Sequence, residues 1–209
     1  MSTGYGDPGG WEERWSRALA QHGDALARRP PNGHLVGEAA GLPPGRALDA
    51  GCGHGAEALW LAGRGWTVTA VDFAATALAY ARDAAAAAGP EIAGRVDWLQ
   101  ADLSAWEPPA GAFDLVVCLY VHITGPVGGM VRRMASAVAP GGTLLMAGHR
   151  PVDPDTGEAT ASAGQVHVSV DEALAVLGPD AWEILVAEDR RRAQPPGGVD
   201  AVIVARRRP

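Results

Sequence analysis

Hydrophobic residues follow two spacings along the chain, one typical of buried strands and one typical of amphipathic helices. Short apolar runs alternate with stretches in which apolar residues recur every three or four positions. This alternation predicts an α/β protein with a parallel sheet, and the last two strands, joined by a polar loop, are expected to form a hairpin. The strands are expected at residues 46–50, 67–72, 96–100, 113–119, 143–147, 182–187 and 199–205, and the helices at 56–62, 76–88, 127–138 and 170–177.

The first 30 residues carry a separate helical pattern, which the Pro30-Pro31 pair ends. Two interpretations of this helix stay open. Its apolar stripe is part of the core, or residues 1–34 form a helical lid that closes over a ligand and excludes water from the reaction. The residues that define the stripe are Trp11, Trp15, Leu19 and Leu26.

A glycine-rich turn is expected between the strand at 46–50 and the helix at 56–62. Gly51 and Gly53 suit this turn because glycine lets the backbone turn tightly and approach a ligand without a Cβ in the way. Asp72 ends the next strand, where a carboxylate can accept hydrogen bonds from both hydroxyls of a ribose. The ligand is therefore expected to carry an adenosine.

Asp49 distinguishes between the cofactors that carry an adenosine. It lies two positions before Gly51, where a carboxylate would repel a pyrophosphate and attract a cationic sulfonium or ammonium. The stretch Gly51-x-Gly53-x-x-Ala56 also satisfies the dinucleotide fingerprint, so the glycines by themselves do not choose between these ligands. The carboxylate favours a cationic ligand.

With these residues the chain resembles the class I S-adenosylmethionine-dependent methyltransferases. Their first motif, Asp-x-Gly-x-Gly, matches Asp49-Ala50-Gly51-Cys52-Gly53. The small tellurite-resistance and thiopurine methyltransferase group is the most similar part of that superfamily, partly through Trp11-Glu12-Glu13-Arg14-Trp15. Further motifs match in the family's order: Asp72 after the second strand, Asp102-Leu103 after the third, 113–118 in the fourth and 139–145 at the turn into the fifth.

The resemblance implies a Rossmann-like three-layer sandwich whose seven-stranded, mostly parallel sheet has an antiparallel C-terminal hairpin strand. It also implies S-adenosylmethionine as the cofactor and S-adenosylhomocysteine as the product. The implied roles place Asp49, Gly51, Cys52 and Gly53 at the methionine part, Asp72 at the ribose and Asp102 at the adenine amino group. Phe73 and Leu103 would pack on the adenine, Cys118 and Leu119 would contact the methionine part through backbone atoms, and Trp11 and Arg14 would approach from the lid.

Two of the six histidines are candidates for the active site. In open sheets of this kind the ligand lies outside the carboxyl ends of the strands, and His122 and His149 lie just beyond the fourth and fifth strands. A hydroxyl acceptor would benefit from a neutral histidine that removes its proton, whereas a thiolate or tertiary amine needs no base. A histidine that only hydrogen-bonds the substrate or a carbonyl is the alternative. No such placement argument applies to His22, His34, His54 or His167.

Length and charge narrow the range of partners. The 209 residues suit a single methyltransferase domain, in which residues 35–209 form the core. The 24 acidic and 17 basic residues give a net charge of −7, which disfavours nucleic acid and anionic membranes because both repel an acidic protein. A small-molecule acceptor is therefore expected, and the oligomeric state is unknown from the sequence.

The two cysteines and the apolar runs bear on localisation. Cys52 and Cys118 show neither disulfide nor metal-site spacing, and the sequence begins without a signal peptide, which together favour the cytoplasm. No apolar stretch approaches the roughly 20 residues that span a bilayer. We expect a soluble protein with no metal site.

Two alternative functions remain open at this level. A nicotinamide-dependent oxidoreductase would share the glycines and Asp72, but it would not predict Asp49, Asp102 or the Pro140-Gly141-Gly142 turn. A non-catalytic module that binds S-adenosylmethionine would keep every cofactor motif, since no residue is demonstrably catalytic from the sequence. A cofactor-binding measurement distinguishes the oxidoreductase from a methyltransferase. A methyl-transfer assay distinguishes the binding module from an enzyme.

Overall fold

The structure is a computed structural model that describes residues 8–27, 29–122, 125–160, 162, 166–192 and 198–209. The chain divides into two compact units, residues 1–106 and 107–209. The organisation of residues 1–34 and 35–209 as lid and core stays a prediction. Residues 1–7 and 28 of the expected lid lie outside the described residues.

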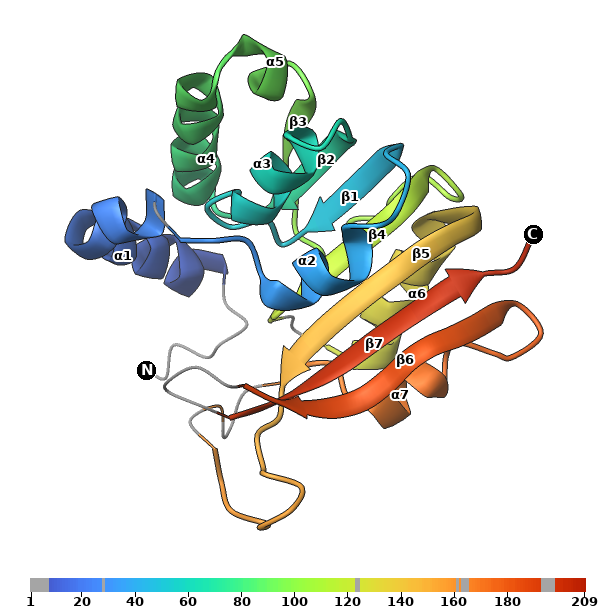
Figure 1. The fold of residues 1–209 in the computed structure, drawn as a ribbon. Helices are drawn as coiled ribbons and strands as arrows, with labels where there is room; N and C mark the ends of the chain where they lie inside the picture. Colours follow the sequence, from blue (N-terminus) through green and yellow to red (C-terminus); the bar gives the residue numbers. More distant parts are fainter. Residues whose placement is uncertain (1–7, 28, 123–124, 161, 163–165, 193–197) are drawn as a thin grey trace. The chain divides into compact units, whose positions relative to one another are not determined.

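The first unit carries three parallel strands in the order β3-β2-β1 (Figure 1). β1 and β2 are buried along nearly their whole length, as expected of inner strands in a parallel sheet. The buried positions of α4, Ala77, Leu78, Ala81 and Ala85, recur at helical spacing. The elements are α1 (Pro8–Ala27), α2 (Gly33–Ala39), β1 (Arg46–Ala50), α3 (Ala56–Ala62), β2 (Thr67–Asp72), α4 (Ala75–Ala88), α5 (Pro90–Ala93) and β3 (Val96–Gln100).

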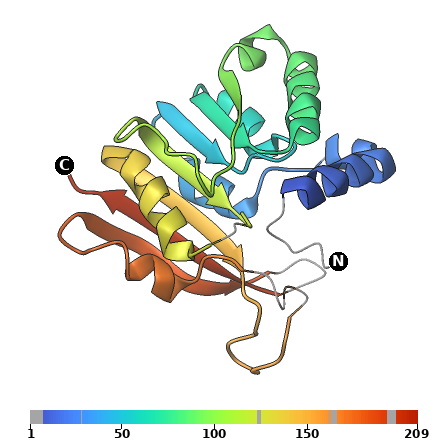
Figure 2. The ribbon, with the colours of Figure 1, turned by 180° about the vertical axis from the view of Figure 1, so that it is seen from behind.

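The second unit carries four strands in the order β4-β5-β7-β6. β4 and β5 are parallel, and β7 runs antiparallel to both of its neighbours, β5 and β6. Two helices, α6 and α7, cover one face of these strands (Figure 2). The elements are β4 (Phe113–Leu119), α6 (Val127–Ala137), β5 (Val138–His149), α7 (Val170–Leu174), β6 (Trp182–Arg191) and β7 (Val199–Arg207).

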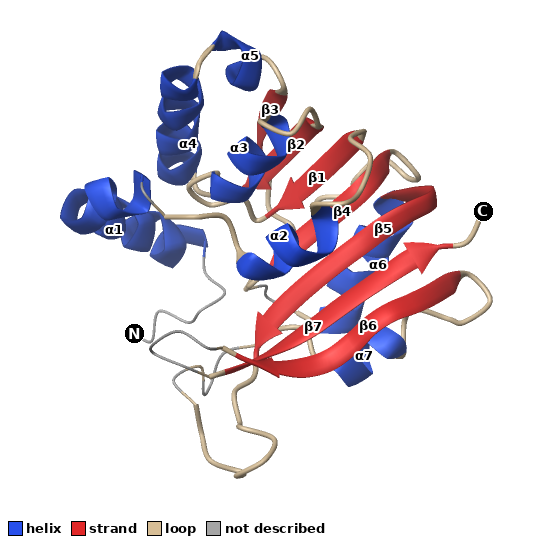
Figure 3. Ribbon diagram, in the orientation of Figure 1, coloured by secondary structure: helices blue, strands red, loops and turns tan. Residues whose placement is uncertain are grey.

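The strand order β3-β2-β1-β4-β5-β7-β6 confirms the predicted seven-stranded, mostly parallel sheet with an antiparallel hairpin strand (Figure 3). Four strands and one helix have the predicted bounds. The short helices α2 and α5 were not predicted, because one or two turns are too short to show a helical period. The N-cap of α2 does carry a local signal, since the Asn32 side chain accepts a hydrogen bond from the His34 N–H at 2.8 Å.

β5 begins five residues earlier than predicted, because the expected turn at Pro140-Gly141-Gly142 is an irregularity within the strand. Val138 pairs with Phe113, and the register then shifts before Thr143 pairs with Leu115. Gly141 has a φ of 79°, in the left-handed region that favours glycine. The inserted residues let the chain bulge and rejoin the ladder.

Gly142 provides a test of this bulge. A Cβ at this position would lie 2.9 Å from the carbonyl oxygen of Ala139 and 3.0 Å from that of Asp114, so backbone would have to move. We expect Gly142→Ala to lower the free energy of unfolding by about 1–3 kcal/mol. The control is Gly128→Ala in α6, where the nearest atom, on Val176, is 3.6 Å away. This control should be neutral or stabilising by up to about 1 kcal/mol, and equal urea midpoints for the two variants would contradict the prediction.

Candidate functional site

The turn after β1 is held by hydrogen bonds to the end of β2. The N–H groups of Gly51 and Cys52 both donate to the carbonyl of Val71, at 2.8 and 3.0 Å. Gly51 and Gly53 have φ values of 82° and 51°, so both positions require a conformation that favours glycine. The structure therefore builds the tight turn that the glycines predict.

Asp72 closes this turn from the second strand. One carboxylate oxygen accepts the N–H of Gly53 and the other accepts the N–H of Ala74, each at 2.9 Å. Burial raises the pKa of Asp72, and the hydrogen bonds from Ala74 and Gly53 oppose that rise because they favour the charged form. Each carboxylate oxygen accepts more than one hydrogen bond, so these contacts leave capacity for the ribose hydroxyls.

Asp49 is a buried carboxylate beside this turn. Its side chain is 3% exposed, and its Oδ2 atom has no hydrogen-bond partner within the part of the chain that the structure describes. Burial raises the pKa of Asp49 well above its usual value, and the negative charges of Glu57 and Asp72 add to the rise. An unpartnered buried carboxylate oxygen is costly, and a cation beside it would relieve that cost.

The N-terminal helix α1 contacts the glycine turn through Trp15. A Cβ on Gly53 would lie 2.7 Å from the Trp15 ring, and the same ring lies 5.9 Å from that of His54 between centroids. Glu12 fastens α1 to α4 by accepting hydrogen bonds from the N–H and hydroxyl of Thr76. Contact with the turn therefore comes from Trp15, a residue that the sequence analysis did not select.

The two residues selected on α1, Trp11 and Arg14, contact each other. The Arg14 guanidinium lies 4.9 Å from the centre of the Trp11 ring, a cation–π distance. Their roles at a cofactor stay predictions. The Trp15 ring covers Gly53, and the lid interpretation of α1 stays a prediction as well.

The segment after β3 is tied to the end of β2. The N–H of Ala101 donates to the carbonyl of Asp72 at 3.1 Å, and the Gln100 side chain donates to the carbonyl of Phe73 at 3.0 Å. Asp102 is exposed and accepts the N–H of Ser104, whereas Leu103 is buried. The residues selected for the ribose and adenine thus follow two neighbouring strands, β2 and β3.

The second unit contains a network of Tyr120, His149 and Asp200. Nδ1 of His149 lies 2.8 Å from one carboxylate oxygen of Asp200, and the hydroxyl of Tyr120 donates to the other at 2.9 Å. Asp200 is fully buried, and the side chain of His149 is 23% exposed. Tyr120 and His149 also stack, with ring centroids 4.2 Å apart.

Two further histidines adjoin this network. The ring of His167 lies 4.1 Å from that of His122 and 5.2 Å from that of His149. The sequence offered no placement argument for His167, and the structure brings its ring beside both candidate histidines. The sequence did not reveal it because His167 belongs to no predicted strand end, and tertiary packing alone brings it to His122.

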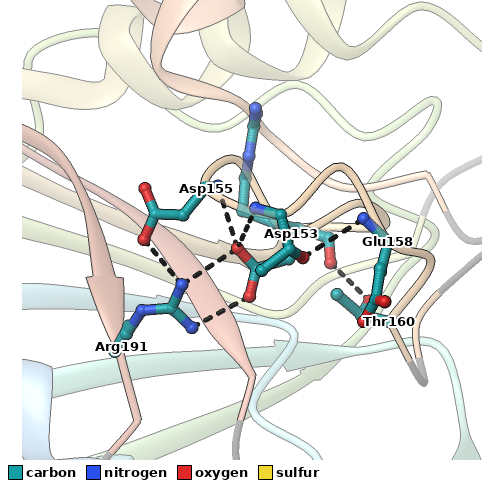
Figure 4. Close-up of polar contacts among 7 residues, drawn as sticks. Asp153, Asp155, Glu158, Thr160 and Arg191 are labelled. Carbon is teal, nitrogen blue, oxygen red and sulfur yellow. Dashed lines mark hydrogen bonds and ion pairs between the residues drawn. The ribbon is translucent and has the colours of Figure 1, made fainter.

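The segment after β5 is an ordered loop fastened to the end of β6 (Figure 4). Arg191 bonds both carboxylate oxygens of Asp153, at 2.9 and 3.0 Å, and one of Asp155 at 2.6 Å. These contacts lower the pKa of Asp153. The Thr160 hydroxyl donates to the carbonyl of Arg150 at 2.6 Å and closes the loop. Residues 161, 163 and 164, which follow this segment, lie outside the described residues.

The cysteines of the motifs are buried thiols. Burial raises the pKa of Cys52, and the carboxylates of Asp49 and Asp72 raise it further, so this thiol is a poor nucleophile. Cys118 and Leu119 lie on β4, in the second unit, and their contact with a cofactor stays a prediction. Among the residues that the structure describes, no group of three or more acidic, cysteine or histidine side chains could hold a metal ion.

Comparison with known proteins identifies the family. A model described as a methyltransferase domain matches residues 47–142. The chain is 32% identical over 193 residues to the probable thiol methyltransferase 2 of Arabidopsis thaliana, covering 90% of this chain and 80% of that protein. The chain belongs to the S-adenosylmethionine-dependent methyltransferases.

Other relatives of this methyltransferase chain differ from it in length. It is 33% identical over 135 residues to the ubiquinone biosynthesis O-methyltransferase of Xanthomonas campestris, and it spans only 55% of that protein's length. Among solved structures, an S-adenosylmethionine-dependent methyltransferase from Mesorhizobium loti shares 25% identity with a TM-score of 0.62, covering 80% of this chain and 94% of that one. TehB from Haemophilus influenzae, at 19% identity and a TM-score of 0.67, has the same fold over 84% of this chain and 62% of its own.

The residues of the first unit fit the family's cofactor. S-adenosylmethionine carries positive charges on its sulfonium and ammonium groups, and Asp49 offers a buried carboxylate oxygen that lacks a partner among the described residues. Asp72 adds a second carboxylate beside the same turn.

None of the helices that the structure describes is long and apolar enough to cross a membrane.

Substitution of Asp49 should separate stability from cofactor binding in this methyltransferase. Because the folded state raises the pKa of Asp49, its charge destabilises the ligand-free protein above the pKa of the unfolded state, near 4. We expect Asp49→Asn to have a higher Tm than the wild type at pH 7, with the difference vanishing towards pH 4. Affinity for S-adenosylmethionine should fall about tenfold or more, because a charged contact is lost.

The charge-matched control for this experiment is Asp83→Asn, at an exposed position of α4. This variant should bind the cofactor as the wild type does and show no comparable gain in Tm. A lower Tm for Asp49→Asn at neutral pH would contradict the assignment.

Proposed function

We propose that this chain catalyses methyl transfer from S-adenosylmethionine to a small-molecule acceptor. The observation that carries the proposal is the buried Asp49, whose Oδ2 has no partner among the described residues and which begins the family's first motif. An anionic ligand would be repelled by this buried carboxylate, whose Oδ2 has no partner within the described residues. A cationic ligand turns the same group into a binding contact.

In this proposal, different residues of the first unit bind different parts of the cofactor. Asp49 holds the cationic methionine part at the Gly51–Gly53 turn, Asp72 accepts the ribose hydroxyls, and Asp102 accepts the adenine amino group. When bound, S-adenosylmethionine supplies a methyl group that leaves a positively charged sulfur as that sulfur becomes neutral. The protein's task is to hold the acceptor atom in line with that group, about 3 Å away.

The net charge supports a small molecule as the acceptor. A net charge of −7 repels anionic polymers at long range. One matching relative, 34% identical over 103 residues, is named a ribosomal RNA small subunit methyltransferase, so RNA is the competing acceptor. A filter-binding assay with a structured RNA at low salt tests this point, and submicromolar binding would argue against a small molecule.

Calorimetric titration with S-adenosylmethionine, S-adenosylhomocysteine and NADH tests the cofactor. We expect micromolar binding of the first two and none of NADH. Binding of NADH alone would overturn the proposal in favour of an oxidoreductase. The non-catalytic binding module predicts the same titration as the enzyme, so formation of S-adenosylhomocysteine with an acceptor is the measurement that separates those two.

Asp72 is the second test of cofactor placement. Asp72→Ala should weaken binding of both adenosyl compounds by roughly 2–4 kcal/mol, because charge-assisted hydrogen bonds to the ribose are lost. Since Asp72 also holds Gly53 and Ala74, Asp72→Asn is measured beside it, as it keeps the side-chain volume and one acceptor oxygen. Unchanged affinity in both folded variants would reject the ribose role.

A further inference from the structure

The contacts around Asp200 form a chain of polar groups in the second unit. The buried carboxylate of Asp200 bonds Nδ1 of His149 on one side at 2.8 Å and the hydroxyl of Tyr120 on the other at 2.9 Å. Arg192 forms an ion pair with the same carboxylate at 3.5 Å. These groups come from the end of β4, the end of β5, the segment after β6 and the start of β7. The carboxylate therefore holds four separate parts of the unit together.

We propose that Asp200 is a positioning residue that orients His149 as the general base for a hydroxyl acceptor of phenol-like acidity. This inference rests on the proposed methyl transfer. A carboxylate accepts but cannot donate, so the nitrogen that faces it must carry the proton. Nδ1 of His149 is therefore protonated, and Nε2 is the nitrogen that can receive the acceptor's proton.

The backbone at Tyr120 supports a functional role for this network. Tyr120 has a φ of 55°, and it is the one non-glycine residue with a positive φ within the described parts of the chain. Such a conformation is strained for a bulky residue. It persists with the Tyr120 hydroxyl bonded to Asp200 and its ring stacked on His149. Strain of this kind concentrates at functional sites.

His167 supports the role of His149 by remaining neutral. Burial, together with the neighbouring His122 and His149, lowers the pKa of His167 to about 3. The ring of His167, 5.2 Å from that of His149, is thus disfavoured from carrying a positive charge beside it. Within the described parts of the chain, the groups that face His149 include Asp200, the Tyr120 hydroxyl and His167, with Arg192 behind Asp200 and His122 behind His167.

The proposed step balances in atoms and charge. Nε2 of His149 takes the O–H proton while the acceptor oxygen forms a bond to the methyl carbon. The carbon–sulfur bond breaks, and its electron pair remains on the sulfur. The imidazolium then returns its proton to water. A hydroxyl acceptor needs this base, whereas a thiolate would not, which is why an oriented histidine favours oxygen.

The first test reads the tautomer of His149 directly, without cofactor or acceptor. Long-range ¹H–¹⁵N NMR of the whole protein near pH 8, with His149→Gln to assign the signal, should show Nδ1–H and an unprotonated Nε2. Asp200→Asn should shift His149 towards the other tautomer, because the amide can donate to Nδ1. Tyr120→Phe should leave the tautomer as in the wild type. An Nε2–H tautomer in the wild type would overturn the proposal, even if no Asp200 variant folds.

The second test uses catechol and thiophenol as probe acceptors and measures S-adenosylhomocysteine formation. We expect turnover of catechol that falls about a thousandfold in Asp200→Asn and His149→Gln. Imidazole should partly restore His149→Ala, and the rate of thiophenol methylation should depend far less on His149. The exposed Glu183→Gln serves as the charge-matched control and should match the wild type.

The outcomes separate this inference from the proposed function. The hydroxyl-base proposal is wrong if the cofactor binds but catechol is not methylated, or if His149→Gln methylates catechol as well as the wild type does. Neither result contradicts the proposed methyl transfer. If the cofactor does not bind at all, the proposed function fails first. The pH profile of kcat/KM for Asp200→Asn shows whether Asp200 acts through His149. If Asp200 were merely structural, kcat/KM would fall without a change in the acidic limb of the profile.

Discussion

The carboxylate of Asp72 holds the turn that carries the proposed cofactor-binding residues of the first unit. It accepts the N–H groups of Gly53 and Ala74 and so joins the loop after β1 to the start of α4. A buried carboxylate is stable in this place only because backbone donors satisfy it. The loop in turn fixes the direction in which Asp49 and the N–H groups of the turn face.

A second buried carboxylate, Asp200, organises the other unit in the same physical way. Its partners are side chains rather than backbone groups, so it positions the His149 imidazole, the proposed base, instead of a turn. A carboxylate with no exposed surface keeps its charge only where donors surround it. Tyr120, His149 and Arg192 provide them. The buried charge thereby becomes a means of holding a base in one orientation.

Much of this arrangement follows from local sequence patterns. The bounds of β1, β2, β3, β4 and α3 are readable because apolar runs and helical spacing end at glycine or polar residues. Asp49, Gly51, Gly53 and Asp72 are readable because a tight turn needs glycine and a cationic adenosyl ligand needs carboxylates. α2 and α5 are not readable, since one or two turns contain too few residues to show a period.

The sequence by itself determined the order of the strands and the longer helices, the glycine turn and the carboxylates that flank it. Each of these features depends on residues that are close together along the chain. The tertiary structure decided which side chains meet across long separations. Trp15 reaches Gly53, His167 reaches His122, and Asp200 reaches both His149 and Tyr120. No local pattern specifies such contacts, since they arise only when strands pair in register and distant segments are brought to one end of a sheet.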